Sequence, residues 1–379
     1  MARRFDTIVV GASCAGLRAA ELLASHGQRV LVIERRAHLE RLTRTWIVTE
    51  HLKPVLGFMP NEAVVHRTSV MRMYAGSAHR DVHLANPDLI VERSRILPLL
   101  AQRAAAAGVE IRLGCSAKNI EETQGGFALR MDSRDRGPEK TELADAIIGA
   151  DGVHSTVARR FGARPQNSVP IVQAKIDLPS GYDSEVTEIW FEPQTTRFFY
   201  WLIPESLNTG ALGVIAERPE NARAILDQFL RLHGMKALEY QGAMIPLHQP
   251  FRQIEWSLPG GGRVLLVGDA AAHVKVTTVG GLVSGLWGAK AAAESLIQGS
   301  SYRRALRSLH AELHVHDAMR WVLDRFSAKD YEHMLTLLGH GLQAVLGRHN
   351  RDSVARAKWS LLAAQPRIVT LAARAVLFS

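Results

Sequence analysis

The stretch DTIVVGASCAGLRAAELLASHGQRVLVIE, residues 6–34, decides the fold of this chain. It reads as an apolar strand, a turn that opens at Gly11, a helix rich in small residues, and a second apolar strand that stops at Glu34. This order, with an acid about 20 residues beyond the glycines, predicts a βαβ unit that binds a dinucleotide. The competing interpretation is an ordinary parallel crossover without a ligand, and the motif alone leaves it open.

Each position of this unit has a physical role. Gly11 permits the tight turn, Gly16 lets helix and strand pack closely, and the helix N-terminus offers N–H groups to a pyrophosphate. Ser13 stands where the motif usually has its middle glycine, and its hydroxyl can donate to a phosphate oxygen. Glu34 suits a bare ribose 2′-OH, as in FAD or NAD. The predicted contacts in this stretch are Gly11, Ser13, Ala15, Gly16, Glu34 and Arg35.

The composition limits the classes of partner. The chain has 379 residues, 47% of them apolar, and its Lys and Arg residues exceed Asp and Glu by nine (46 − 37). This basic balance suits an anionic ligand or an anionic membrane surface, and we expect no nucleic acid because no known binding signature is present. Both cysteines, Cys14 and Cys115, fall in the predicted nucleotide-binding fold, so we expect a reduced, cytoplasmic protein. We expect neither a signal peptide nor a membrane span.

The rest of the chain divides by pattern into an α/β fold with an inserted α+β sheet domain. Residues 170–260 alternate short apolar runs with turns, which is typical of an antiparallel sheet. The segment after it returns to the strand–helix pattern, and the last part is helical in pattern. We predict a discontinuous Rossmann-like domain from 1–63, 88–168 and 255–300, a substrate domain from 64–87 and 169–254, and a C-terminal helical region from 301–379.

Two further motifs follow predicted strands. GADGVHST, residues 149–156, places Asp151 in a turn where ligands of open α/β sheets bind, although such turns are also common without ligands. GDAAAHVKVTTVGGL, residues 268–282, ends a strand in Gly-Asp and opens a long helix at paired glycines. Asp269 could accept hydrogen bonds from a polyol chain, and the helix start could stabilise negative charge. The predicted contacts are Asp151, Gly268, Asp269, Gly280, Gly281 and Leu282.

The three motifs in this order, with Glu34 between the first two, resemble the FAD-dependent group typified by p-hydroxybenzoate hydroxylase. Arg93, which follows Glu92 at the start of a predicted helix, resembles a recurrent flavin-contacting arginine of that group. The resemblance covers the chain to about residue 300 and implies an oxidoreductase with FAD as cofactor. No second dinucleotide-binding unit is visible, so an external donor, NAD(P)H or ferredoxin, would reduce the flavin.

A narrower resemblance is to the geranylgeranyl reductase family, whose motif reads G-D-A-A-G-x-V-K-P-T-T-G-G-G. Residues 268–281 read G-D-A-A-A-H-V-K-V-T-T-V-G-G, and Ala272, Val276 and Val279 are the departures. The family also has a Y-x-W-x-F-P type segment, which residues 200–204 resemble imperfectly. This resemblance implies reduction of C=C bonds in a lipophilic isoprenoid substrate by hydride from flavin N5.

Other activities stay open on the same scaffold. One is an FAD-dependent monooxygenase that hydroxylates an aromatic or polyketide substrate with NAD(P)H and O₂. Another is a flavin-binding protein without turnover. A flavin-dependent halogenase ranks low, because Lys53 is the only lysine between Glu34 and Ser94 and its context is weak.

We assign no catalytic side chain from the sequence. No Cys/His spacing predicts a metal site, and packing roles are favoured for Cys14 and His273. The aromatic and methionine residues of the substrate sheet would alternate between its faces, so about half can line an apolar pocket over the flavin. The predicted pocket residues are Met71, Trp190, Phe198, Tyr200 and Trp201.

The C-terminal tail is basic and amphipathic. Within residues 343–379 a single acid, Asp352, stands against six basic residues, Arg348, Arg351, Arg356, Lys358, Arg367 and Arg374. A helix of this kind can lie on an anionic membrane surface, or it can pack on the protein with a solvated basic face. Peripheral membrane contact is therefore a hypothesis.

Overall fold

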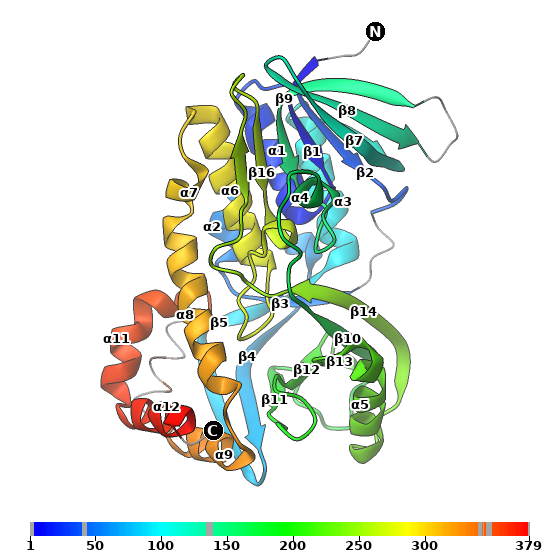
Figure 1. Cartoon of the computed structure of the whole chain (residues 1–379). Coiled ribbons are helices and arrows are strands. Elements are labelled where there is room, and N and C mark those ends of the chain that lie inside the picture. Colours follow the sequence, from blue (N-terminus) through cyan, green and yellow to red (C-terminus); the bar gives the residue numbers. More distant parts are fainter. Residues whose placement is uncertain are drawn as a thin grey trace.

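The chain folds around two eight-stranded sheets, which lie one above the other in Figure 1. The structure is a computed structural model that describes residues 4–39, 44–133, 139–339, 343, 345 and 351–377. Among these residues, no helix combines the length and the apolar character needed to cross a bilayer.

The first sheet has a parallel centre in the order β16-β9-β1-β2-β6. Residues 7–10 of β1 and all of β2 are buried, and they are mostly apolar, as expected for strands that are covered on both faces. β15 and the β7–β8 pair extend it in antiparallel fashion. The strands are β1 (Arg4–Val10), β2 (Val30–Glu34), β6 (Glu110–Leu113), β7 (Cys115–Thr123), β8 (Gly126–Ser133), β9 (Lys140–Gly149), β15 (Glu255–Ser257) and β16 (Arg263–Leu266).

The helices that pack on these strands share one apolar core with them. Small residues on α1 and α6, such as Ala19, Ala20, Ala289 and Ala292, are fully buried and let the helices approach closely. The helices are α1 (Cys14–Ser25), α2 (Leu52–Leu56), α3 (Arg93–Ala106), α4 (Thr156–Arg160) and α6 (Leu282–Gln298), with short 3₁₀ turns η1 (Asn61–Ala63) and η2 (Gly268–Ala271).

The second sheet has the order β14-β10-β13-β12-β11-β4-β5-β3. All its neighbours are antiparallel except β11 and β4. Helix α5 (Pro219–Leu232) packs its apolar side on one face of this sheet. The strands are β3 (Thr45–Val48), β4 (Val64–Ala75), β5 (Ala78–Glu92), β10 (Ser168–Asp177), β11 (Val186–Trp190), β12 (Tyr200–Pro204), β13 (Thr209–Ile215) and β14 (Ala237–Pro246).

The C-terminal helices join the two halves. Helix α8 runs along the side of the molecule past both sheets, and α9, α11 and α12 gather beside β4 and β5 (Figure 1). Leu309 and Leu313 of α8 belong to the core of the first sheet, whereas Tyr331 of α9 and Leu371 of α12 belong to a core with β4 and β5. The helices are α7 (Tyr302–Ala305), α8 (Arg307–Leu323), α9 (Ala328–Thr336), α11 (Val354–Ala364) and α12 (Arg367–Leu377).

The α/β fold with a second, antiparallel sheet and a helical C-terminal region is confirmed. The division along the chain differs in detail, because β3 and the end of β5 pair within the second sheet although we placed residues 45–48 and 88–92 with the first. Within the tail, Arg348 and the side chain of Lys358 lie outside the described residues.

Candidate cofactor site

The β1–α1 turn has the close approaches that its glycines predict. Gly11 has a φ of +107°, and a Cβ there would lie 2.5 Å from the carbonyl oxygen of Ala150. A Cβ at Gly16 would lie 2.2 Å from the carbonyl oxygen of Gly11. Ser13 is the N-cap of α1, and its hydroxyl accepts the N–H of Gly16 at 3.1 Å. The hydroxyl proton remains available to a phosphate, as the interpretation of Ser13 requires.

Glu34 closes the turn from the end of β2. Its carboxylate accepts the N–H of Ala12 at 3.0 Å and the N–H of Arg36 at 2.9 Å, and the residue is buried. The guanidinium of Arg36 lies 3.8 Å from the same carboxylate, whereas Arg35 is exposed. The acid is therefore held beside the glycine-rich turn, and Arg36 rather than Arg35 is the basic residue next to it.

Two arginines lie together at the start of α3. The N–H of Arg93 donates to the carbonyl of Arg44 at 3.1 Å, and both guanidinium groups lie near the ring of Trp46, 6.0 Å for Arg44 and 5.5 Å for Arg93. Burial and the neighbouring Arg93 lower the pKa of Arg44 to about 10. The Nε and Nη1 atoms of Arg44 and the Nε atom of Arg93 are buried without a hydrogen-bond partner among the described residues. An anion bound here would accept hydrogen bonds from these buried N–H groups and offset the cost of burying two positive charges.

Asp269 is the carboxylate that faces the pair. Burial raises its pKa, and the charges of Arg44 and Arg93 act in the opposite direction. Gly281 approaches this carboxylate so closely that a Cβ there would lie 3.2 Å from Oδ1. Gly268 has a φ of +61° and packs on Ala15, which brings the β1–α1 turn and the 268–282 segment together. Leu282 begins α6 directly after Gly281.

Asp151 has a local structural role in addition to the one expected. Its carboxylate accepts four hydrogen bonds at the start of α4, from the N–H and hydroxyl of Thr156, the hydroxyl of Ser155 and the N–H of Val157. Ser155 is the N-cap, and its hydroxyl accepts the N–H of Ala158 at 2.9 Å. The turn at residue 151 thus fixes the chain beside the carbonyl that Gly11 approaches.

The segment 268–281 contains two residues in the left-handed region of backbone space. Ala272 has a φ of +57° and Val279 has a φ of +51°, and they are the only non-glycine residues with positive φ in the described part of the chain. Both stand where the reductase motif has glycine. For a β-branched residue this conformation is an outlier. The segment keeps the backbone that glycine would give it, at a cost in strain of about 1–3 kcal/mol for each position.

His273 and Cys14 are poor candidates for proton transfer. Burial lowers the pKa of His273 to about 3, so its ring is neutral at pH 7. Burial raises the pKa of the Cys14 thiol to about 12, although the charge of Arg93 opposes this. Both values favour the packing roles that the sequence indicates.

Comparison with known proteins decides which dinucleotide this site serves. The FAD binding domain family matches residues 4–314. The chain belongs to this family. The family match covers the three motifs and the arginine pair, and it makes the protein an FAD-dependent oxidoreductase.

Similar proteins include reductases of isoprenoids. The chain is 27% identical over 331 residues to geranylgeranyl diphosphate reductase, chloroplastic, of Oryza sativa, which covers 79% of this chain and 68% of the relative. It is 26% identical over 306 residues to digeranylgeranylglycerophospholipid reductase 2 of Methanothermobacter thermautotrophicus, 74% of each chain. The resemblance to geranylgeranyl reductases is therefore confirmed at modest identity.

Solved structures share the fold. A geranylgeranyl bacteriochlorophyll reductase-like protein of Thermoplasma acidophilum has a TM-score of 0.83 at 17% identity and covers 98% of both chains. Aklavinone-11 hydroxylase, solved with FAD and aklavinone, has a TM-score of 0.62 at 21% identity and covers 84% of this chain and 70% of its own. The fold thus hosts both reductases and hydroxylases.

The residues present fit FAD. Its pyrophosphate is an anion, and the arginine pair offers buried N–H groups that lack a partner. The glycine-rich turn and the helix N-terminus behind Ser13 suit the same group. Asp269 and Glu34 are the two acids next to these features and would accept hydrogen bonds from the hydroxyls of the ribityl chain and the ribose. Arg44 is a candidate contact that motif spacing missed, because it precedes a short edge strand, Thr45–Val48, that has no clear pattern of its own.

The five predicted substrate residues separate into different surroundings. Residues 268–282 are called the flavin segment from here on. Phe198 and Trp201 pack in one apolar cluster with Val274 and Val279 of this segment. Tyr200 and Trp190 lie under α5 instead, with their rings 4.2 Å and 5.2 Å from the ring of Phe229. Met71 packs against the cluster of α9 and α12. Only Phe198 and Trp201 therefore adjoin the flavin segment.

Proposed function

We propose that this FAD-dependent oxidoreductase reduces C=C bonds of a lipophilic isoprenoid substrate. The observation that carries the proposal is the apolar contact between the second sheet and the flavin segment. Phe198, Trp201 and Ile203 of the sheet side pack with Val274 and Val279. An isoprenoid chain offers only apolar surface to such a wall, so burial of that surface would supply its binding energy. The names of the curated relatives support the same substrate class.

Half-buried apolar side chains at the rim of this cluster mark where a chain would lie. They are Ile47, Val65, Ile171, Phe199, Ala243 and Leu247. The ring of Trp201 lies against Gly213, where an added Cβ would clash with the indole. Gly213 thus fixes the position of the largest side chain in the wall.

The protein and the cofactor divide the chemistry. When bound and reduced by the electron donor, FAD would supply the hydride for one carbon of the double bond, and a proton would complete the other carbon. Arg44, Arg93 and Asp269 hold the cofactor, and the apolar wall keeps water away from the reacting bond. The electron donor we propose is NAD(P)H or ferredoxin, which would act without a binding unit of its own in this chain.

Anaerobic turnover tests the proposal. The FAD-loaded protein, reduced with dithionite, is offered geranylgeranyl lipids, prenylated quinones and aromatic polyketides, and the products are weighed by mass spectrometry. We expect a gain of two hydrogen atoms per double bond without oxygen. Product that forms only in air and gains one oxygen atom would overturn the proposal in favour of a monooxygenase, the alternative that the fold of aklavinone-11 hydroxylase keeps open.

A pair of neighbouring variants tests the wall. Trp201→Leu removes the indole from the flavin side and should raise KM for an isoprenoid substrate about tenfold, with FAD content unchanged. Tyr200→Phe lies one residue away on the α5 side and loses only the hydroxyl contact to Thr195, so its KM should stay at the wild-type value. Equal KM values in both variants would show that the wall does not bind the substrate.

A further inference from the structure

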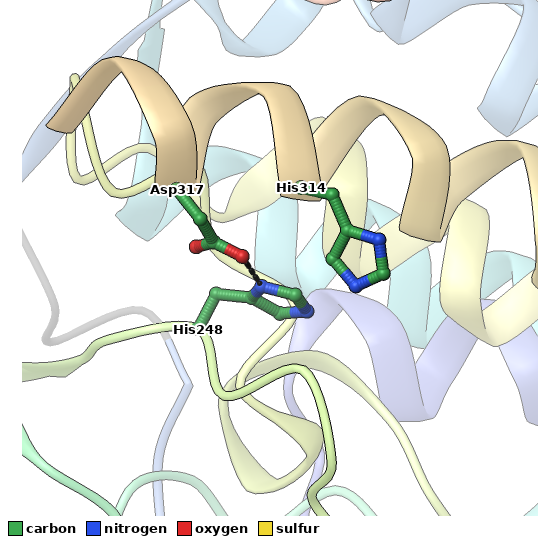
Figure 2. A group of neighbouring side chains, drawn as sticks. All are labelled: His248, His314 and Asp317. Carbon is green, nitrogen blue, oxygen red and sulfur yellow. Dashed lines mark hydrogen bonds and ion pairs between the residues drawn. The ribbon is translucent and has the colours of Figure 1, made fainter. Parts of the chain in front are cut away.

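Helix α8 presents histidines toward the connection between β14 and β15. His310 and His314 are four residues apart, which places them on one side of the helix, and Asp317 follows on the same side. His248 approaches from the connection, and the ligand atoms of His248, His314 and Asp317 all lie within 4.8 Å of one another. Figure 2 shows these three side chains pointing toward one another.

Asp317 fixes the orientation of His248. Its Oδ2 atom lies 2.7 Å from Nδ1 of His248, whose side chain is only 4% exposed (Figure 2). A carboxylate on one ring nitrogen sets the tautomer and leaves the lone pair of Nε2 free for a metal ion. In Figure 2 this second nitrogen points toward the ring of His314. The arrangement is the one that metal-binding histidines commonly have with an outer carboxylate.

The imidazole rings of His248 and His314 lie close enough to share one ion. Their ring centres are 5.6 Å apart, whereas the ring centre of His310 lies 6.2 Å from that of His314 and 6.3 Å from that of His248. Two imidazoles on a tetrahedral zinc ion have ring centres about 5.3 Å apart, since each Zn–N bond is about 2.0–2.1 Å and a ring centre lies about 1.2 Å further. The His248–His314 pair is near this spacing, and His310 lies outside it.

A second observation lies on the inner side of the cluster. His273 is 1% exposed, its ring centre is 6.4 Å from that of His310, and neither of its ring nitrogens has a hydrogen-bond partner among the described residues. A buried polar ring without partners is costly in free energy. The histidine cluster therefore continues from the surface at His314 to the flavin segment.

We propose that His248 and His314 bind one divalent transition-metal ion of the zinc class, and that Asp317 orients His248. Imidazole ligands suit Zn²⁺ and its neighbours in the first transition row and do not suit Mg²⁺ or Ca²⁺. The ion ties α8 to the β14–β15 connection, directly behind the flavin segment that contains His273. Motif spacing in the sequence did not predict it, because His248 comes from a different element than the His310/His314 pair.

Titration of the FAD-loaded, tag-free protein with Zn²⁺ after chelator treatment tests the site. We expect one ion per chain, a Kd in the micromolar range or below, and a rise in Tm that Mg²⁺ does not produce. His314→Ala is the main variant because His314 is exposed and its loss should leave the fold intact. It should weaken Zn²⁺ binding at least tenfold and abolish the rise in Tm.

Two further variants complete the experiment. Asp317→Asn should weaken binding about 10–100-fold, as loss of an outer-shell partner does. His333→Ala, an exposed histidine on α9, is the matched control and should bind Zn²⁺ like the wild type. The proposal is overturned if the tag-free protein binds no stoichiometric Zn²⁺ at micromolar concentration, or if His314→Ala binds as tightly as the wild type.

Discussion

Ala272 and Val279 show how single residues can depart from a motif while the backbone keeps its shape. Both have a positive φ, and both replace a glycine of the reductase motif. Ala272 is fully buried and Val279 is 6% exposed, in the cluster that faces Trp201. Packing of these side chains therefore offsets part of the backbone strain that they bring.

Two substitutions at position 279 separate strain from packing. Val279→Ala and Val279→Gly both lose the buried isopropyl group, but only glycine relieves the positive φ. We expect Val279→Gly to be more stable than Val279→Ala by about 1 kcal/mol, the reverse of the usual order in which glycine costs about 0.5–1 kcal/mol. Urea denaturation of the FAD-loaded proteins measures the difference. If Val279→Ala were instead more stable than Val279→Gly, the segment would have relaxed to a conformation with negative φ at this position.

Asp269 is the residue on which FAD affinity should depend most. Asp269→Ala removes an acceptor for the cofactor hydroxyls, and a hydrogen bond to a charged group contributes about 1.5–3 kcal/mol. Its Kd for FAD should therefore rise by roughly 10–150-fold, measured by flavin fluorescence in equilibrium dialysis. Asp177→Ala, at the exposed end of β10, is the control. Wild-type affinity in Asp269→Ala would remove this residue from the site.

At the scale of elements, a buried ionic network holds the flavin segment to the C-terminal region. Lys275 pairs with Asp352, and both side chains are 5% exposed. Thr49, just beyond β3, donates its hydroxyl to the same Asp352 carboxylate at 2.6 Å. Beside it, Arg351 lies 2.7 Å from Asp88 of β5. Arg351 and Asp352, which are neighbours in the chain, thus connect the second sheet to the flavin segment.

Histidine and glutamate side chains of α8 complete this network. His316 bonds Thr277 at 2.5 Å, and its other nitrogen lies 3.1 Å from the carbonyl of Arg351. Glu312 accepts the N–H groups of Val354 and Ala355 at the start of α11. The flavin segment therefore rests on α8 and on residues 351–355, which precede and begin α11.

The ionic network around Asp352 predicts how the free energy of unfolding depends on pH. The charge of Lys275 and hydrogen bonds from Lys275 and Thr49 lower the pKa of Asp352 to about 2, against a burial effect in the other direction. A lowered pKa means that the stabilisation is complete above about pH 4 and is lost as pH falls toward 2. Burial lowers the pKa of Lys275, and the charge of Asp352 opposes this shift.

Asp352→Asn should lower the free energy of unfolding by about 3–5 kcal/mol at pH 7, because it leaves the Lys275 charge buried and unpaired. The loss of stability between about pH 4 and pH 2 should also become shallower. Chemical denaturation across this range measures both effects, with Asp177→Asn as the exposed control. An acid profile identical to that of the wild type would show that Asp352 does not contribute to it.

The sequence predicted strands and helices well where the spacing of apolar residues alone determines them. The alternation of apolar runs and turns over residues 170–260 predicts an antiparallel sheet, and strands β10 to β14 of the second sheet lie there. It could not place Thr45–Val48, since a four-residue strand at a sheet edge is set by its partner β5 and not by its own pattern. The roles of Tyr200 and Trp201 also depended on packing, because alternation separates the faces without saying which one meets the flavin segment.

At the scale of the whole molecule, the motifs predicted the cofactor. The sequence did not predict the contacts between segments that are distant along the chain. Each motif has its own local chemistry, and the order of the three motifs made Gly11, Glu34 and Asp269 recognisable together. The pairing of Lys275 with Asp352, and of His248 with α8, joins residues that no local pattern relates. Such contacts arise only when the two sheets and the C-terminal helices come together.

The C-terminal helix shows what its amphipathic pattern is used for. Leu371 and Ala375 of α12 are buried in the cluster with α9, and Arg374 lies 2.8 Å from Asp330 of α9. Among the side chains of α12 that the structure describes, Val369 is the one large apolar residue that is exposed, at 51%. The apolar stripe of α12 therefore packs on the protein, and contact with a membrane would depend on charge.

Vesicle flotation tests this at the level of the intact protein. With a net charge of +9, the full chain should float with anionic vesicles at low salt and should be released at about 0.5 M salt, where charges are screened within a few ångströms. Val369→Glu should float nearly as well as the wild type, because no apolar face of α12 is free to insert. Flotation that survives high salt and is lost in Val369→Glu would instead mean that α12 leaves α9 and enters the membrane surface.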